Sequence, residues 1–277
     1  MNGNPRIEQA KAALKAADCL LIGGGAGLSA AAGLEYAGER FTGRFADFIE
    51  RYGFRDMYTA GFYPFGTEEE RWAYWARHIA VNRYEPPALP LYRRLYDLVK
   101  DRDYFVITTN VDAQFAKAGF DEERLFAVQG DYGQCQCANG CHDALYENET
   151  MVKAMLAHTR DCRIPSGCVP RCPVCGGRMA VHLRCDRYFV EDAGWHTAHA
   201  RYQAFLRRAE SRRTLLLELG VGYNTPGIIR YPFEQMTARN PLAVLIRMNR
   251  DDPDGVEENR GKTIVFPEDM NEVMAAL

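Results

Sequence analysis

The sequence predicts an α/β protein built on a doubly wound, parallel, Rossmann-like sheet, with an inserted helical segment and a small cysteine-rich module. Three observations predict this class. Short apolar runs that end in glycine or polar residues alternate with helical patterns. Residues 41–100 have helical spacing and many aromatics, and most of the 9 cysteines lie between residues 135 and 175.

The composition excludes several classes of protein. The chain has 277 residues, is 47% hydrophobic and carries a net charge of −3, which is typical of a large globular domain with or without a smaller one. Its lysines and arginines are dispersed, so we expect no nucleic-acid partner. No apolar run reaches the length of a membrane span, and the apolar run 19–34 is too rich in glycine for a signal peptide. We therefore expect a cytoplasmic protein without membrane contact.

The elements follow in order. Residues 5–17 carry an apolar stripe and predict a helix, and residues 18–24 predict a buried strand that runs into glycines. A small-residue helix begins after them, which completes the opening of a nucleotide-binding βα unit. Further strands are predicted at 104–110, 124–130, 213–222, 242–249 and 262–266, and further helices at 195–210, 225–236 (with Pro226 in the first turn) and 267–277.

Two segments interrupt this alternation. Residues 41–100 read as a helical insertion, with a break at the proline-rich residues 86–90, and their aromatics are expected to form core. Residues 135–191 hold most of the cysteines and lack a sustained period, so they predict a separate zinc-binding module. The Rossmann-like domain is then formed by residues 1–40, 101–134 and 192–277.

A glycine-rich turn follows the first strand. Gly25, Gly27 and Ala30 fit the pattern G-x-G-x-x-A, and Ser29 lies between them. Glycines allow a pyrophosphate to approach the backbone at a helix N-terminus. The spacing alone is also compatible with an ordinary βα turn. A dehydrogenase would carry an acidic residue at the end of a second strand about 20 residues later, and that stretch is helical here, which disfavours hydride transfer.

The cysteines predict a metal site. Cys137 and Cys141 form one pair, and Cys172 and Cys175 form a second pair in a CPVCGG knuckle. Four thiolates suit a tetrahedral zinc ion and leave no open position, so the zinc is expected to be structural. Cys135 is an alternative to Cys137 as the ligand.

Taken together, the motifs resemble those of the sirtuin family over nearly the whole chain. The motifs that carry the resemblance are GAGLSAAAGL at 25–34, TTNVD at 108–112, Gln129-Gly130, the two cysteine pairs, GVGYNTPG at 220–227 and MNRDD at 248–252. Two departures stand out. Sirtuin deacylases have a catalytic histidine where this chain has Gln129, and a Pro-Asp-Phe-Arg stretch where it has residues 35–38. In both departures the chain is similar to the macrodomain-linked, class M sirtuins.

The resemblance implies NAD as the substrate that carries the ADP-ribose, and zinc as the structural metal. It further implies protein mono-ADP-ribosyltransferase activity toward a lipoylated carrier protein that resembles the glycine-cleavage H protein, with a macrodomain hydrolase that reverses the modification. It also implies a set of NAD-binding residues, namely Gly25, Ala26, Gly27, Ser29, Gly33, Thr109, Asn110, Asp112, Gln129, Gly220, Asn224 and Asn249.

The chemistry of Gln129 favours the same activity. A deacylase needs a general base to drive a ribose hydroxyl onto its intermediate, and such help contributes about 10²–10⁴-fold in rate. Glutamine has no useful proton equilibrium, whereas a carboxylate acceptor arrives ionised and needs no base. We expect Asn110 to hydrogen-bond the nicotinamide ribose or a water and Asp112 to accept from the nicotinamide carboxamide. Arg184, or its neighbour Arg187, would pair with the acceptor carboxylate.

Two other functions remain open. One is an NAD-dependent lysine deacylase that tolerates Gln129. The other is a non-catalytic NAD or ADP-ribose sensor, against which Asn110 and Asp112 argue because a sensor needs no polar pair at the nicotinamide end. A dehydrogenase is the least favoured function.

Overall fold

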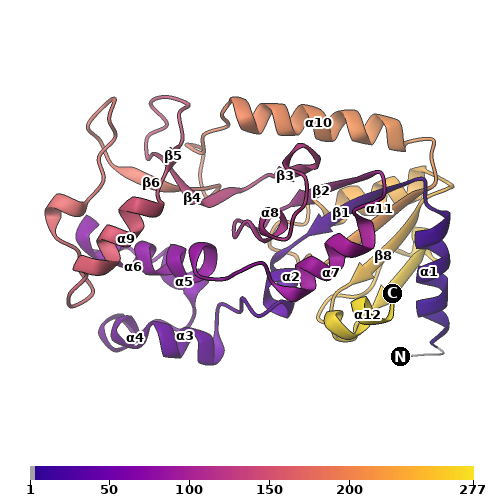
Figure 1. The fold of residues 1–277 in the computed structure, drawn as a ribbon, viewed down its shortest axis with the longest axis horizontal. Coiled ribbons are helices and arrows are strands. Elements are labelled where there is room, and N and C mark those ends of the chain that lie inside the picture. Colours follow the sequence, from indigo (N-terminus) through magenta and orange to yellow (C-terminus); the bar gives the residue numbers. More distant parts are fainter. Residues whose placement is uncertain (1–3) are drawn as a thin grey trace. The chain divides into compact units, whose positions relative to one another are not determined.

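The chain forms two compact units in the computed structural model, which describes residues 4–277 (Figure 1). The first unit, here called the sheet unit, contains the residues up to Gly33, Ala88–Val128 and Ala193–Leu277. The second, here called the zinc unit, contains Leu34–Pro87 and Gln129–Asp192. Each is described by itself.

A six-stranded sheet forms the centre of the sheet unit, and every neighbouring pair of its strands is parallel. In spatial order the strands are β3 (Leu125–Ala127), β2 (Tyr104–Thr108), β1 (Cys19–Gly24), β7 (Thr214–Leu219), β8 (Val244–Met248) and β9 (Thr263–Phe266). All residues of β1, β2 and β7 are buried, as expected for strands covered on both faces. The predicted doubly wound parallel fold is confirmed.

Helices cover both faces of this sheet. Alternate residues of β1 point to opposite faces, so Leu20 and Ile22 pack in one core while Cys19 and Leu21 pack in the other. The first core is closed by α1 (Pro5–Ala16), α2 (Ala26–Ala31), α7 (Pro90–Val99) and α12 (Met270–Ala276), and the second by α10 (Ala193–Ala209) and α11 (Arg230–Arg239). Short helices at Gln114–Lys117 (α8), Glu122–Arg124 and Glu257–Asn259 complete the unit.

One predicted helix begins later than expected. The sequence predicts a helix with Pro226 in its first turn, but α11 begins at Arg230 and residues 226–229 form a turn. Gly227 has a poor helix propensity, and the turn allows the side chain of Arg230 to reach the carbonyls of Asp252 and Asp254. Pro226 therefore belongs to the loop that follows β7.

The zinc unit combines a small antiparallel sheet with short helices. The sheet has the order β5 (Tyr146–Glu147), β4 (Gly130–Cys137) and β6 (Met179–Leu183). The helices are α3 (Gly38–Arg44), α4 (Ala46–Tyr52), α5 (Met57–Gly61), α6 (Glu68–Ile79) and α9 (Glu149–His158), with a π-helix at Ala80–Tyr84 and a 3₁₀ turn at Ser166–Cys168. Thr67 and Glu70 form a capping box that starts α6. Phe45, Phe48 and Trp72 are fully buried, as expected for core aromatics.

The two units divide the chain differently from the three predicted domains. The predicted helical insertion and cysteine module fall in one unit, except that α7, expected in the insertion, packs on the sheet. Among the described residues 4–277, no helix has both the length and the apolar character needed to span a membrane.

Candidate functional site

The loops that follow the carboxyl ends of β1, β2, β7 and β8 carry most of the predicted site residues. The chain proceeds from β1 to β2 and β3 on one side, and from β7 to β8 and β9 on the other. The order of strands therefore reverses between β1 and β7. In open parallel sheets, this reversal is where ligands bind.

Three glycines bring the loops after β1 and β7 into direct contact. The Gly27 amide donates to the Gly220 carbonyl at 2.9 Å, and the Gly25 amide donates to the Leu219 carbonyl at 3.0 Å. Gly220 has a φ of +61°, and a Cβ there would lie 2.2 Å from the Leu28 nitrogen. A Cβ on Gly25 would lie 2.6 Å from the Gly220 oxygen. The glycines are thus required by the approach of one turn to the other.

Ala26 and Gly27 are exposed on the outer side of this contact, whereas Gly25 is buried. The helix that they begin, α2, has only six residues and ends at Ala31, and Gly33 follows with a φ of +101°. The backbone of this turn is therefore open to a ligand at Ala26 and Gly27. Gly33 serves the helix end.

The loop after β2 is fastened to the same turn. The Thr109 amide donates to the Gly24 carbonyl at 3.1 Å, and the side-chain nitrogen of Asn110 donates to the Gly25 carbonyl at 2.9 Å. That nitrogen also lies 3.0 Å from the Ser29 hydroxyl. Because the side-chain nitrogen of Asn110 faces the protein, its side-chain oxygen is the atom left to accept from a ligand.

Asp112 is buried and joins the same network. Its Oδ2 accepts from the Ser29 hydroxyl at 2.5 Å, and its Oδ1 accepts from the Gln114 amide at 3.0 Å. The turn between them needs a left-handed residue, which is Ala113 with a φ of +56°. The structure therefore brings Ser29, Asn110 and Asp112 together.

Tyr92 is a member of this network that the sequence analysis misses. Its hydroxyl lies 2.8 Å from the Ser29 hydroxyl and 3.2 Å from the Asn110 side-chain nitrogen. It comes from α7 and is fully buried. The helical spacing of the segment identifies Tyr92 as core, but spacing does not reveal where a hydroxyl points.

Asn249 and Asn224 lie in the loops after β8 and β7. The Asn249 side chain donates to the Val221 carbonyl at 2.9 Å and accepts from the amides of Asp251 and Asp252 at 3.0 Å. It therefore holds the two loops together. Asn224 is exposed, so its side chain faces solvent in the protein alone.

A buried ionic network supports these two loops and is also missed by the sequence analysis. Arg247 donates to both carboxylate oxygens of Glu218, at 2.7 and 3.0 Å, and to Glu234 at 2.9 Å. Glu218 and Arg247 are neighbours in register on β7 and β8 and are 0% exposed. Arg230 donates to the carbonyls of the loop after β8. Burial raises the pKa of Glu218, although the bonds from Arg247 oppose this.

Gln129 and Arg184 are neighbours in the zinc unit. The Arg184 amide donates to the Gln129 carbonyl at 3.0 Å, at the end of the β4–β6 pair. Gly130 follows with a φ of +100°, and a Cβ there would lie 2.1 Å from the His182 oxygen. Both Gln129 and Arg184 are half-buried. Arg187 is exposed and contacts Tyr188, so Arg184 is the arginine that lies beside Gln129.

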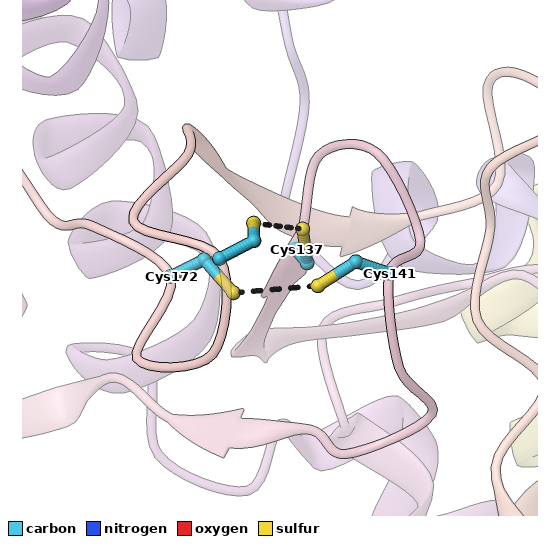
Figure 2. Close-up of side chains that lie close together, drawn as sticks. Cys137, Cys141 and Cys172 are labelled. Carbon is cyan, nitrogen blue, oxygen red and sulfur yellow. Dashed lines mark hydrogen bonds between the residues drawn. The ribbon is translucent and has the colours of Figure 1, made fainter.

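The four predicted cysteine ligands form one cluster (Figure 2). The sulfurs of Cys137 and Cys175 are 3.7 Å apart, and so are those of Cys141 and Cys172. Zinc–sulfur bonds of about 2.3 Å place tetrahedral sulfurs about 3.8 Å apart. The separations and the all-thiol donor set therefore fit zinc, and the predicted zinc site is confirmed as a cluster of this composition.

Nearby groups favour the thiolate form of one ligand. Burial opposes ionisation of Cys137, but hydrogen bonds from the amides of Cys141 and Asn139 and from neighbouring thiols lower its pKa to about 6. His142 lies 3.0 Å from the Cys141 sulfur through Nδ1 and 2.8 Å from the Tyr146 hydroxyl through Nε2. This histidine therefore holds the edge of the cluster in place.

Cys135, the alternative ligand, lies outside the cluster. It is buried, its sulfur accepts from the Asn148 side chain at 3.5 Å, and burial raises its pKa to about 11. A thiol that resists ionisation is a poor zinc ligand. Cys137 is therefore the residue that completes the set.

Comparison with known proteins gives two curated relatives. The chain is 38% identical over 270 residues to the "Protein ADP-ribosyltransferase" of Staphylococcus aureus, a match that covers 96% of this chain and 85% of that protein. It is 34% identical over 246 residues to a Fusarium oxysporum protein named "Probable bifunctional ADP-ribose hydrolase/ADP-ribosyltransferase", of which it spans 41%. No protein-family model matches the chain.

Solved structures of sirtuins share the fold. A structure of a Sir2 enzyme covers 97% of this chain and 94% of its own, with a TM-score of 0.57 and 17% identity. A Sir2 protein bound to a propionylated peptide gives a TM-score of 0.58 at 16% identity over 97% of this chain and 95% of its own. At these identities the likeness concerns the fold.

Proposed function

Because the chain belongs to the family of sirtuin-type protein ADP-ribosyltransferases, we propose that it transfers one ADP-ribose unit from NAD to a side-chain carboxylate of an acceptor protein. NAD binds at the carboxyl edge of the parallel sheet. The NAD-dependent transferase class follows from the family. The residues and the acceptor are our proposal.

The hydrogen-bond network around Ser29 supports the proposal that the nicotinamide end of NAD binds there. With its side-chain nitrogen held by Gly25 and Ser29, Asn110 offers an oxygen to a ribose hydroxyl. Asp112 offers carboxylate oxygens to the nicotinamide carboxamide, in a site already shaped by Gln114 and Tyr92. Preorganised groups of this kind lose little freedom when a ligand binds.

The loops after β1, β7 and β8 are proposed to hold the rest of NAD. Ala26 and Gly27 provide exposed backbone for the diphosphate. Gly220, Asn224 and Asn249 would meet the adenosine half. Thr109 and Gly33 shape the loops in which these groups lie.

The electron balance explains why a carboxylate suits this site. The bond between the ribose and the pyridinium nitrogen breaks, its electron pair leaves with neutral nicotinamide, and a carboxylate oxygen forms the new bond to the ribose. No proton has to move, because the acceptor arrives as an anion and becomes an ester. A hydroxyl acceptor would need a base, and Gln129 cannot provide one.

The observation that carries the proposal is the backbone hydrogen bond between the Arg184 amide and the Gln129 carbonyl. It brings together two residues whose side chains suit the transfer, since an amide orients a hydroxyl or an acceptor without taking its proton and a guanidinium matches the geometry of a carboxylate. An acceptor carboxylate that pairs with Arg184 would be positioned and kept ionised.

We propose a lipoylated carrier protein that resembles the glycine-cleavage H protein as the acceptor, and a macrodomain hydrolase as the enzyme that removes the modification, in the cytoplasm. The name of the Fusarium relative joins an ADP-ribose hydrolase to a transferase in one protein. That name supports a pairing of the two activities.

The experiment is incubation of the purified protein with labelled NAD and the carrier protein, with and without lipoate, followed by mass spectrometry of the modified residue. We expect label on an Asp or Glu of the lipoylated carrier. Asn110→Ala and Gln129→Ala should each reduce transfer by about 100-fold or more, because each side chain positions a reacting group. Gln134→Ala is the matched control and should transfer normally, because Gln134 is a half-buried glutamine of β4 that contacts Glu147.

Two other outcomes would replace the proposal. Rapid formation of O-acyl-ADP-ribose from an acyl-lysine peptide would establish a deacylase. Binding of NAD by calorimetry without release of nicotinamide, even with the carrier present, would establish a sensor.

A further inference from the structure

Arg184 already has a carboxylate partner within its own unit. Its Nη2 donates to Oε1 of Glu191 at 2.6 Å, and its guanidinium lies 4.1 Å from the centre of the Phe189 ring. The side chains are 33% and 36% exposed. A charged pair that is only partly screened by water is stronger than a fully exposed one.

The segment that carries Glu191 is held firmly. The Gln136 side chain donates to the Tyr188 carbonyl at 2.7 Å and accepts from the Val190 amide at 3.0 Å. The His182 ring stacks on Phe189, with centroids 4.5 Å apart, and its Nε2 lies 3.0 Å from the Val190 carbonyl. Glu191 is therefore presented to Arg184 at a fixed place.

We propose that Glu191 occupies, in the protein without acceptor, the carboxylate position on Arg184 that the acceptor side chain takes. This inference rests on the proposed function, because it assumes that Arg184 binds the acceptor. Engagement of the acceptor is then an exchange of one carboxylate for another on the same guanidinium.

The exchange favours acceptors that are docked proteins. Glu191 competes with the acceptor for Arg184. Because Glu191 belongs to the same chain as Arg184, its effective concentration at the guanidinium is in the mM range. A free carboxylate metabolite lacks that advantage and binds Arg184 only weakly. A carboxylate on a docked protein has a similar advantage. It binds Arg184 more tightly still if it forms the two parallel hydrogen bonds that a guanidinium supports, compared with the bond that Glu191 makes at 2.6 Å.

The test compares Glu191→Gln with the wild-type protein. The amide keeps the size and the hydrogen bond but loses the charge. We expect the KM for the carrier protein to fall by about 3- to 10-fold with little change in kcat, given the usual strength of a charge-assisted bond. Inhibition by free glutarate should strengthen by a similar factor. Glu191→Asp, which keeps the charge, should stay near wild type.

Two further variants make the test specific. In an Arg184→Gln background, Glu191→Gln should change nothing, because the guanidinium for which the carboxylates compete is gone. Glu149→Gln removes an exposed ion pair with Lys153 on α9 of the same unit and should behave as wild type.

The proposal is overturned if Glu191→Gln raises the KM, leaves it unchanged, or has the same effect without Arg184. Equilibrium affinity for the carrier protein in the absence of NAD should rise in parallel with the fall in KM. That measurement separates the two proposals, because it reports the exchange at Glu191 even if the wild-type protein transfers no ADP-ribose.

Discussion

A single buried histidine, His78, shows how strongly the environment of a residue determines its charge. It is 1% exposed, and its ring meets four aromatic rings at centroid distances of 4.9–5.7 Å, those of Tyr36, Tyr74, Trp75 and Tyr132. The Tyr74 hydroxyl donates to the Met57 carbonyl, so it accepts from Nδ1 of His78. Burial, with a contribution from the charge of Arg40, lowers the pKa of His78 to about 3.

This pKa predicts a loss of stability in acid. The unfolded chain binds a proton at His78 near pH 6.5, whereas the folded protein does so only near pH 3. The stability that neutral His78 contributes is therefore complete above about pH 6.5 and falls as the pH is lowered toward 3. Between pH 7 and pH 5 we expect a loss of about 2 kcal/mol in the free energy of unfolding from this residue.

Urea unfolding of the wild-type protein and of His78→Phe at both pH values measures this contribution. The ring of phenylalanine fills the same space but does not titrate, so the variant should lose about 2 kcal/mol less than the wild type on acidification. An equal loss in both proteins would show that His78 does not carry this pH dependence.

At the scale of elements, two turns contact each other at the carboxyl edge of the parallel sheet. The turns after β1 and β7 approach so closely that Gly220 has no room for a Cβ. Two other glycines in the same region differ: Gly222 and Gly227 have no atom within 4 Å of the place of a Cβ. The loop after β7 thus begins with a glycine that the fold requires and continues with glycines that it does not.

Gly220→Ala should therefore destabilise the protein and weaken its binding of ADP-ribose. A left-handed alanine costs about 1–2 kcal/mol and a forced separation of packed backbone a further 1–3 kcal/mol. Gly222→Ala is the matched control and should change the free energy of unfolding by less than about 0.5 kcal/mol. Urea unfolding and calorimetry with ADP-ribose measure both effects. Similar behaviour of the two variants would contradict a special role for Gly220.

The sequence identifies where several residues of this edge lie, for a physical reason. Gly25, Asn110 and Asp112 directly follow strands that apolar runs identify, and the ends of parallel strands meet at one edge. Tyr92 and Arg230 could not be predicted in this way, because the side chain of each forms hydrogen bonds with a different element of the fold. Glu218 and Arg247 did leave a signal, since each is a charge within an apolar strand.

At the scale of the whole molecule, the zinc cluster joins distant parts of the chain in one unit. The two ligand pairs, Cys137 with Cys141 and Cys172 with Cys175, are 31 positions apart, counted from Cys141 to Cys172, and α9 lies between them. A structural metal supplies folding free energy to the module that binds it. The metal is thus expected to stabilise the small sheet that ends beside Gln129.

We expect one zinc ion per chain, measured by atomic emission. Cys172→Ser should lose the metal and destabilise the zinc unit, because a site with three thiolates binds zinc less tightly. Cys168→Ser is the control, since Cys168 lies outside the cluster, and it should keep the full metal content. Retention of zinc by Cys172→Ser would refute the ligand set.

The chain passes from one unit to the other four times, after Gly33, Pro87, Val128 and Asp192. Its two central strands pair Cys19 with Thr214, 195 residues further on. During synthesis, therefore, the first strand leaves the ribosome long before its neighbour exists. The backbone of β1 therefore stays unpaired on that side, and liable to associate wrongly, until the 195 residues that follow Cys19 have been made.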